Sequence, residues 1–315
     1  MLGFGGGFGL VVTGLLMNDG APYQRVFWLC TVATAVALIA ACIVVPDRPR
    51  FVQAEIDWRG GAGLAVGLAA WLLTITQGSR WGWTSPAILL SVVTGAPVLR
   101  WWWSWSRRCS NPLVSVSMLT RRPVLLGNVA TLLVGMGLYF SFLGTTGFVE
   151  APVGSGYGFH ASVLDGSVEF LLPGALAAAV TALTAGRYIE RFGPRTVIAV
   201  GACAGALGFS VLLQWHSAPW QIVLAGLFTN AYISLAYGAL PVLVLQNVAE
   251  GETGIATSLN AVFRKVGSAI AAALFAGLAK PAADGHIPES AFVAVFALGA
   301  VTAVLALWLA LRPAR

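Results

Sequence analysis

The sequence predicts an all-α integral membrane protein with about ten transmembrane helices. Of its 315 residues, 58% are hydrophobic and 10% are charged, whereas soluble domains have roughly 45–50% apolar and roughly 25% charged residues. A soluble globule of this composition would have too few charged side chains to cover its surface. The 37 glycines and 15 prolines lie in long apolar runs, where close helix packing in a bilayer accommodates them. The predicted surroundings of the chain are therefore a lipid bilayer.

Apolar runs that are long enough to cross a bilayer recur along the chain, with polar breaks between them. A hydrocarbon core of about 30 Å needs roughly 20 helical residues. The predicted spans are residues 2–17, 26–45, 60–78, 85–103, 124–149, 162–185, 196–214, 219–245, 254–279 and 290–311. The first of these spans is the shortest.

Lysine and arginine are divided unevenly between the two sets of connections that ten spans create. One set holds only Arg25, Arg80 and Lys280, and we assign the remaining 15 of the 18 basic residues to the other set, including Arg264 and Lys265. Basic connections stay in the cytoplasm. The sequence therefore predicts a multi-pass protein of the plasma membrane with both termini in the cytoplasm.

A short charged connection between the sixth and seventh predicted spans carries family information. The segment 186–195 reads GRYIERFGPR, and it resembles the loop signature of the major facilitator superfamily. The matching residues are Gly186, Arg187, Glu190, Arg191, Gly193 and Arg195. In such a transporter, a tight turn of this kind would pair its acid with arginines and a neighbouring helix end, stabilising one conformation. The alternative interpretation is an ordinary basic cytoplasmic turn.

A glycine-rich stretch near the N-terminus resembles a second signature, that of the fifth helix in drug:proton antiporters of the superfamily. Gly5, Gly9 and Gly14 match its spacing, while Leu10 stands in place of a proline and Thr13 in place of a glycine. Glycines four residues apart lie on one helix face, so close helix packing alone is the alternative explanation.

Further segments resemble the fourteen-helix drug:proton antiporter branch of the same superfamily. They are residues 56–60, 171–174 and 251–267. The resemblance covers nearly the whole chain and implies a partial major facilitator fold, helices five to fourteen of a fourteen-helix parent, without the first four. It also implies three parts: the last two helices of an N-terminal bundle (1–45), two connector helices with a cytoplasmic loop (46–123) and a C-terminal six-helix bundle (124–315).

The function that this resemblance implies is secondary active export of amphipathic small molecules or drugs in exchange for protons, by alternating access. Two alternatives stay open: a truncated protein or half-transporter that needs a partner chain, and a facilitator for a metabolite.

Neither a cofactor nor a metal site is expected, since His160, His216 and His286 fall in separate extracellular connections. The tryptophans at 101–105 beside Arg107 and Arg108 are typical of a membrane-interface anchor, so no nucleic-acid partner is predicted. No catalytic pair can be named, and the chain is not expected to be an enzyme.

Ionisable and polar residues inside spans are the candidates for transport roles, because such residues are costly in a membrane. Glu169, with Asp165 one turn before it, is the predicted proton-coupling acid, and burial of Glu169 is expected to raise its proton affinity. The candidates for lining a central cavity are Asn128, Tyr139, Asn230, Tyr232 and Asn260, with Gln77 and Tyr237. Each of these is equally compatible with a hydrogen bond between helices.

Overall fold

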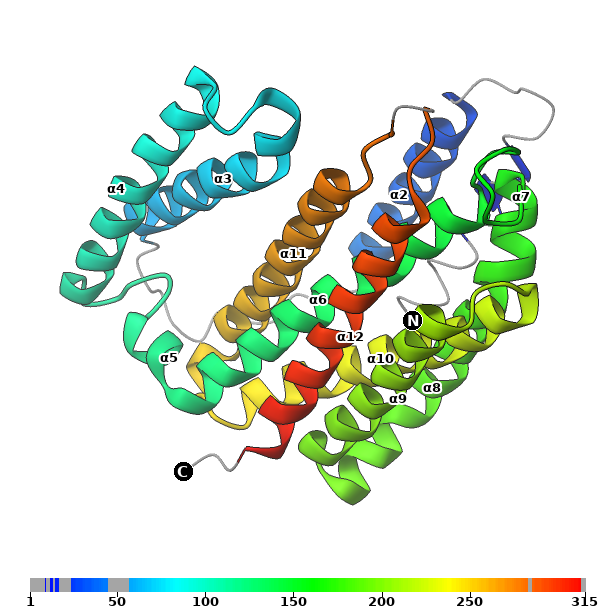
Figure 1. Ribbon diagram of the computed structural model, residues 1–315. Helices are drawn as coiled ribbons and strands as arrows, with labels where there is room; N and C mark the ends of the chain where they lie inside the picture. The colour runs from blue at the N-terminus through cyan, green and yellow to red at the C-terminus, as the bar shows by residue number, and fades with distance from the viewer. Residues whose placement is uncertain are drawn as a thin grey trace.

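The structure is a computed structural model that describes residues 24–44, 57–282 and 285–312, together with Gly9, Val12, Thr13, Leu15 and Leu16. These residues form helices and connections without a strand. The helices are α2 (Gln24–Val44), α3 (Trp58–Trp81), α4 (Pro86–Arg108), α5 (Val116–Thr120), α6 (Arg122–Val149), α7 (Val163–Asp165), α8 (Leu172–Phe192), α9 (Pro194–Gln214), α10 (Pro219–Leu245), α11 (Thr253–Leu278) and α12 (Glu289–Leu311) (Figure 1). A π-helical turn, Gly166–Leu171, joins α7 to α8.

Eight helical segments in the described residues are long and apolar enough to cross a membrane. They are α2, most of α3, α6, the continuous segment from α7 to α8, α9, α10, α11 and α12. The predicted span 85–103 is also a helix, α4, but its tryptophans and arginines make it less apolar than these eight. The predicted span 2–17 lies mostly outside the described residues. The all-α prediction is confirmed, and the long helices coincide with the other nine predicted spans.

The helices from α6 to α12 form one bundle, and α3 and α4 form a separate pair beside α11 (Figure 1). Within the bundle, α6 contacts α10, α11 and α12, while α9 packs against α10 and α12, and α8 lies along α10. The interior is filled by fully buried aromatic rings, namely Phe140, Phe148, Phe209, Phe292 and Phe296. In contrast, no residue of α2 is buried.

Glycine permits the close crossing of α6 and α11. A Cβ atom on Gly135 would collide with the backbone carbonyl of Arg264, and one on Gly267 would collide with the carbonyl of Leu132. The hydroxyl of Ser268 donates to the carbonyl oxygen of Gly135 at 3.3 Å across the same crossing. Small residues of this kind let two backbones approach closely in a membrane.

The connection between α8 and α9 is a single residue, Gly193. Gly193 has a φ of +80°, a conformation that side chains disfavour, and Pro194 begins α9. The chain therefore stops and restarts at Gly193 and Pro194, as the sequence indicates. The predicted span 162–185 ends too early, because α8 continues through Gly186 to Phe192.

The start of α3 is fastened to the end of α4. Asp57 caps α3, accepting a hydrogen bond at 2.8 Å from the backbone N–H of Gly60 and one at 3.0 Å from the indole of Trp105. The N–H of Leu113 also donates to this carboxylate, at 3.5 Å. Burial alone would raise the pKa of Asp57, but these hydrogen bonds outweigh it and hold the pKa below its usual value.

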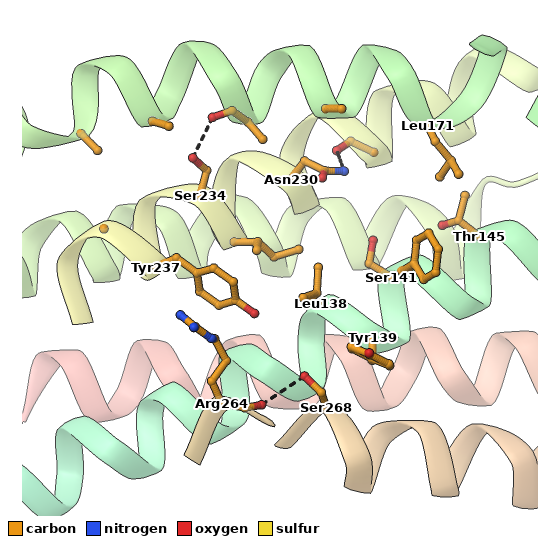
Figure 2. A pocket seen from close by; sticks show the side chains of 18 of the residues that line it. Leu138, Tyr139, Ser141, Thr145, Leu171, Asn230, Ser234, Tyr237, Arg264 and Ser268 are labelled. Atoms are coloured by element: carbon orange, nitrogen blue, oxygen red, sulfur yellow. Dashed lines mark hydrogen bonds between the residues drawn. The ribbon is translucent and has the colours of Figure 1, made fainter. Parts of the chain in front are cut away.

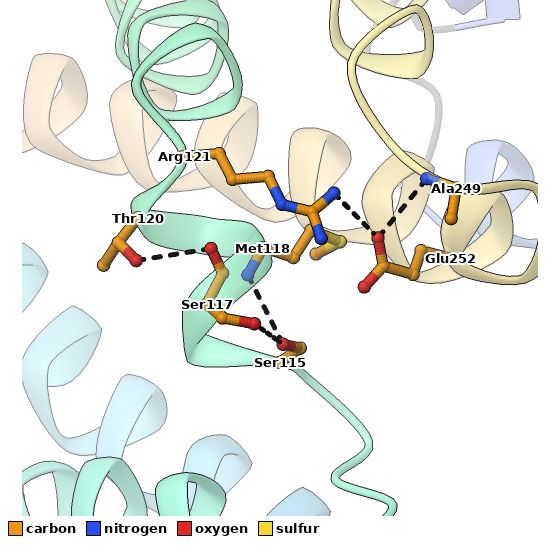
Figure 3. Close-up of polar contacts among 7 residues, drawn as sticks. All are labelled: Ser115, Ser117, Met118, Thr120, Arg121, Ala249 and Glu252. Atoms are coloured by element: carbon orange, nitrogen blue, oxygen red, sulfur yellow. Dashed lines mark hydrogen bonds and ion pairs between the residues drawn. The ribbon is translucent and has the colours of Figure 1, made fainter.

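An ion pair joins the start of α6 to the turn before α11. The guanidinium of Arg121 lies 3.2 Å from the carboxylate of Glu252, which also accepts the backbone N–H of Ala249 (Figure 3). Both side chains are partly exposed. A pair of this kind contributes little to stability, but it links two segments that are far apart in the sequence.

Candidate functional site

A cavity of about 670 Å³ lies among α6, α8, α10 and α11. It is lined by Leu138, Tyr139, Ser141, Phe142 and Thr145 of α6, Phe170 and Leu171 of the π-helical turn, Ala175, Ala178, Ala182 and Ala185 of α8, Gly226, Asn230, Ile233, Ser234, Tyr237 and Gly238 of α10, and Arg264, Lys265 and Ser268 of α11. Cavities that hold drug-sized ligands are about 300–1,000 Å³. The volume is therefore sufficient for such a molecule.

The wall from α8 is made of alanines at intervals of three and four residues, which places them on one helix face. Because their side chains are short, α8 leaves open space opposite α6. A hydrogen bond joins the α8 and α10 walls of the cavity: the hydroxyl of Ser234 on α10 donates to the carbonyl oxygen of Ala178 on α8 at 2.7 Å (Figure 2).

Two basic residues of α11, Arg264 and Lys265, line the cavity. The guanidinium carbon of Arg264 lies 4.8 Å from the centre of the Tyr237 ring, and Figure 2 shows the two side chains facing each other. Arg264 is half-buried, whereas Lys265 is exposed. Our assignment of these two residues to a cytoplasmic connection was wrong, because α11 carries both of them in its interior.

Sequence reasoning missed this pair although the necessary signal was present. The predicted span 254–279 contains both basic residues, and charges inside a span indicate function by default. They were instead counted with the basic residues that orient the protein.

Of the polar residues predicted to line a cavity, Tyr139, Asn230 and Tyr237 do so. The amide nitrogen of Asn230 donates to the carbonyl oxygen of Gly226 on its own helix, at 2.9 Å. Its position on α10 places the amide beside the open space (Figure 2). Gln77 lies on α3, outside the bundle that forms the cavity.

Asn128, Asn260 and Tyr232 do not line the cavity, which corrects the prediction for these residues. The amide of Asn260 donates to the side-chain oxygens of Asn128 at 3.1 Å and Thr131 at 2.7 Å, joining α11 to α6. Tyr232 is fully buried against Gly205 and Gly137, between helices. Asn128 and Asn260 thus form a hydrogen bond between helices, which was the alternative explanation, whereas Tyr232 packs between helices and its buried hydroxyl forms no hydrogen bond with a described residue.

The two acids predicted to couple protons lie on the outside of the bundle. Asp165 is exposed and accepts a hydrogen bond from the hydroxyl of Ser162 at 2.7 Å. Glu169 lies in the π-helical turn and is also exposed, so the expected burial of this side chain was wrong. Neither acid lines the cavity, although Phe170, which directly follows Glu169, does. Glu150, just beyond α6, is partly buried, and this burial raises its pKa.

The charged residues of the 186–195 segment lie at the end of α8 and the start of α9. Glu190 is exposed and forms no ion pair with any described residue, so the expected pairing of this acid is not observed. The guanidinium of Arg191 lies over the ring of Phe192, and Arg195 donates to the carbonyl oxygen of Arg312 at 3.4 Å. Gly186 and Arg187 are exposed on α8.

Of the glycines in the N-terminal stretch, the structure describes only Gly9. It is helical and exposed, and a Cβ atom there would meet no described residue within 4 Å. Close packing of Gly9 against the described part of the chain is therefore not observed. Gly5 and Gly14 lie outside the described residues.

Among the side chains that the structure describes, no group of three or more His, Cys, Asp or Glu residues is arranged to hold a metal ion.

A bundle of membrane-spanning helices around a cavity with a few polar groups is the architecture of a membrane transporter. Residues 158–315 match the family model of the Major Facilitator Superfamily. This match covers half of the chain, and the chain belongs to that superfamily. The family is one of transporters, and this membership places the chain outside the enzymes.

Three curated relatives are similar to this chain at low identity. The puromycin resistance protein pur8 of Streptomyces alboniger is 28% identical over 298 residues, covering 91% of this chain and 56% of that protein. The multidrug resistance protein Stp of Mycobacterium tuberculosis is 23% identical over 258 residues, covering 82% and 47%. The multidrug transporter mfsC of Aspergillus fumigatus is 26% identical over 186 residues, covering 59% and 35%. The chain thus spans about a third to about half of the length of these relatives.

The fold is similar to that of a solved transporter structure. The crystal structure of the nucleoside transporter NupG aligns with 99% of this chain and 83% of its own chain, with a TM-score of 0.50 and 10% sequence identity. At this identity, the likeness concerns the fold alone.

Proposed function

We propose that this chain is part of a secondary active transporter that exports amphipathic small molecules in exchange for protons, with the cavity of the α6–α12 bundle as its cargo site. The observation that carries the proposal is the cavity itself, with its volume of about 670 Å³, a mainly apolar lining and a few polar side chains. Apolar pockets of this kind discriminate poorly among amphipathic ligands. The relatives named for puromycin and multidrug resistance support such a cargo. So does a tetracycline resistance determinant of Streptomyces rimosus, which is 23% identical to this chain over 238 residues.

The proposed parent is the fourteen-helix drug:proton antiporter branch, of which this chain would carry helices five to fourteen. Residues 124–315 then form the C-terminal bundle, residues 46–123 the connectors and residues 1–45 the end of the N-terminal bundle. The proposed location is the plasma membrane, with both termini in the cytoplasm. Removing Arg264 and Lys265 from the cytoplasmic set leaves 13 of the original 15 basic residues there, against three on the other side. This bias still supports the orientation.

Glu169 and Asp165 are the proposed proton-coupling acids. Glu169 is exposed on the bundle surface and directly precedes two cavity-lining residues, so a change of its charge would act next to the cargo site. Alternating access requires that the acid bind its proton with different affinity in the two conformations. The 186–195 segment and the Gly5, Gly9 and Gly14 stretch are proposed to take part in that conformational change.

The test is efflux from proteoliposomes containing the 315-residue chain, with puromycin or tetracycline as cargo and an imposed pH gradient. Ala182→Trp would fill the cavity, because Ala182 lines it. We expect this variant to lose at least 90% of the gradient-driven efflux. The matched control is Leu183→Trp on the neighbouring residue, which is 73% exposed and does not line the cavity. Equal efflux by both variants would exclude the cavity as the route.

The coupling acid is tested in the same assay with Glu169→Gln, which keeps the side-chain volume and hydrogen bonding but removes the titration. We expect the gradient dependence of efflux to disappear while cargo binding is preserved. Asp165→Asn tests the second acid in the same way. If both variants retain gradient-dependent efflux, the coupling group lies elsewhere in the protein.

A further inference from the structure

The charges that line the cavity are unbalanced. Two basic residues, Arg264 and Lys265, contribute to the lining, and no Asp or Glu residue does. At about 1.5 Å per residue, Arg264 lies roughly 16 Å from the first residue of α11 and roughly 21 Å from its last. The positive charge is therefore held near the middle of a helix that is long and apolar enough to span a membrane, and an uncompensated charge is most costly at the middle of a span.

The surroundings of Arg264 compensate its charge only in part. The ring of Tyr237 attracts the guanidinium by a cation–π contact at 4.8 Å. Beyond this contact, none of the five N–H donors of the guanidinium forms a hydrogen bond with a described residue, and in the described part of the chain no carboxylate forms an ion pair with Arg264. A guanidinium in this position is suited to bind a carboxylate, sulfonate or phosphate through two parallel hydrogen bonds.

Charged and apolar groups are separated along the cavity. Figure 2 shows Arg264 and Tyr237 at one end, Asn230 between the ends, and Leu171 and Thr145 at the other. Phe170 and Phe142 add aromatic surface to the lining. A ligand that fits this arrangement has an anionic group at one end and an apolar body at the other.

We infer that the cavity binds amphipathic organic anions, with Arg264 as the group that binds the anionic head and Lys265 beside it on the open side. The inference rests on the proposed function, since it specifies the chemistry of the ligand at the same site. The anionic head belongs either to a soluble organic acid or to an anionic lipid, which present the same chemistry to the guanidinium.

The test is equilibrium binding to the 315-residue chain in phosphatidylcholine nanodiscs, with empty nanodiscs as the blank. Three ligands share one ring system and differ in charge: naphthaleneacetate, neutral naphthaleneacetamide and cationic naphthylmethylammonium. We expect the wild type to bind the acetate at least tenfold more tightly than the amide, and the ammonium most weakly. Isothermal titration calorimetry measures all three affinities.

The variants assign the preference to one side chain. Arg264→Gln should reduce the acetate-to-amide ratio to below twofold and leave the amide affinity unchanged, which shows that the cavity is intact. Arg264→Lys, which keeps the charge but cannot form the two parallel hydrogen bonds, should retain only part of the preference. Lys280→Gln is the matched control, because Lys280 is exposed and does not line the cavity, and it should behave like the wild type.

Nanodiscs that contain phosphatidylglycerol distinguish the two sources of the anion. If the head belongs to a lipid, phosphatidylglycerol weakens acetate binding to the wild type and not to Arg264→Gln; if it belongs to a soluble acid, the affinity is unchanged. Both results support the anion site. Equal wild-type affinity for acetate and amide, or an equal loss of all three ligands in Arg264→Gln, would overturn it.

These measurements use no pH gradient, so they are independent of the proposed transport. An Arg264-dependent preference for the acetate, together with equal efflux by Ala182→Trp and Leu183→Trp, would refute the cavity as the transport route and support the anion site. Efflux that depends on the cavity while binding shows no charge preference would refute only the anion site.

Discussion

Asn260 and Arg264 lie one helical turn apart on α11, yet their surroundings differ. Asn260 is 2% exposed, and its amide donates to two side chains of α6. Arg264 extends into the cavity, where an aromatic ring is its side-chain contact. The difference shows how polar residues within spans can be interpreted. An amide that forms hydrogen bonds to a neighbouring helix holds the helices together. A cation whose N–H donors form no hydrogen bond with a described residue is available to a ligand.

Two regions are compared: the α6–α11 crossing, where Asn260 lies, and the cavity, which Arg264 lines. The largest difference in stability between them is expected for substitutions of their glycines. Gly135→Ala places a methyl group against the backbone carbonyl of Arg264, which cannot move without separating α6 from α11. We expect a loss of about 3 kcal/mol in the free energy of unfolding. Gly238→Ala in the cavity lining meets its nearest atom at 3.5 Å and should change stability by less than about 0.5 kcal/mol. Unfolding by sodium dodecyl sulfate in mixed micelles measures both, and equal losses would refute the contrast.

A smaller difference is expected for the two asparagines. Asn260→Leu leaves Asn128 and Thr131 without their shared donor, and we expect it to destabilise the chain by about 1–2 kcal/mol without changing ligand affinity. Asn230→Leu removes an amide whose hydrogen bond, among the described residues, is made within its own helix, so ligand affinity should change more than stability. The same unfolding assay, combined with ligand titration, separates the two effects. A change of ligand affinity in Asn260→Leu would show that the regions are coupled.

The smallest effect on stability is expected at Asp57, whose carboxylate accepts its hydrogen bonds outside the spans. Because folding lowers its pKa, the stabilisation is complete above the normal carboxyl pKa and is lost as the pH falls through the lowered value. Hydrogen exchange at Leu113, corrected for the intrinsic rate, should lose protection over this acidic range. In Asp57→Ala the protection should be low at every pH, with a loss of about 1 kcal/mol. Protection that is independent of pH in the wild type would contradict this role.

The sequence predicts the helices of this protein better than the functional site. Long apolar runs must form helices in a membrane, because every backbone group needs a partner there, and the long helices follow these runs. Which side of a span faces a cavity depends on its neighbours, so Asn230 and Asn260 could not be distinguished by their positions. Arg264 could have been identified as a functional candidate from its place within a predicted span. The exposure of Glu169 could not have been predicted, since it depends on the rotation of its helix.

That rotation has a local cause in the π-helical turn Gly166–Leu171. Pro173 has no N–H to donate to the carbonyl of Glu169, and the turn contains more residues than an α-helical one. An α-helix rotates by about 100° per residue, so one additional residue changes the phase of everything that follows by about that angle. A single helical wheel drawn through residues 163–192 therefore superimposes two different faces. The phase change sets which side of α8 carries its alanines toward the cavity, and the deletion of one residue from the turn would present another side.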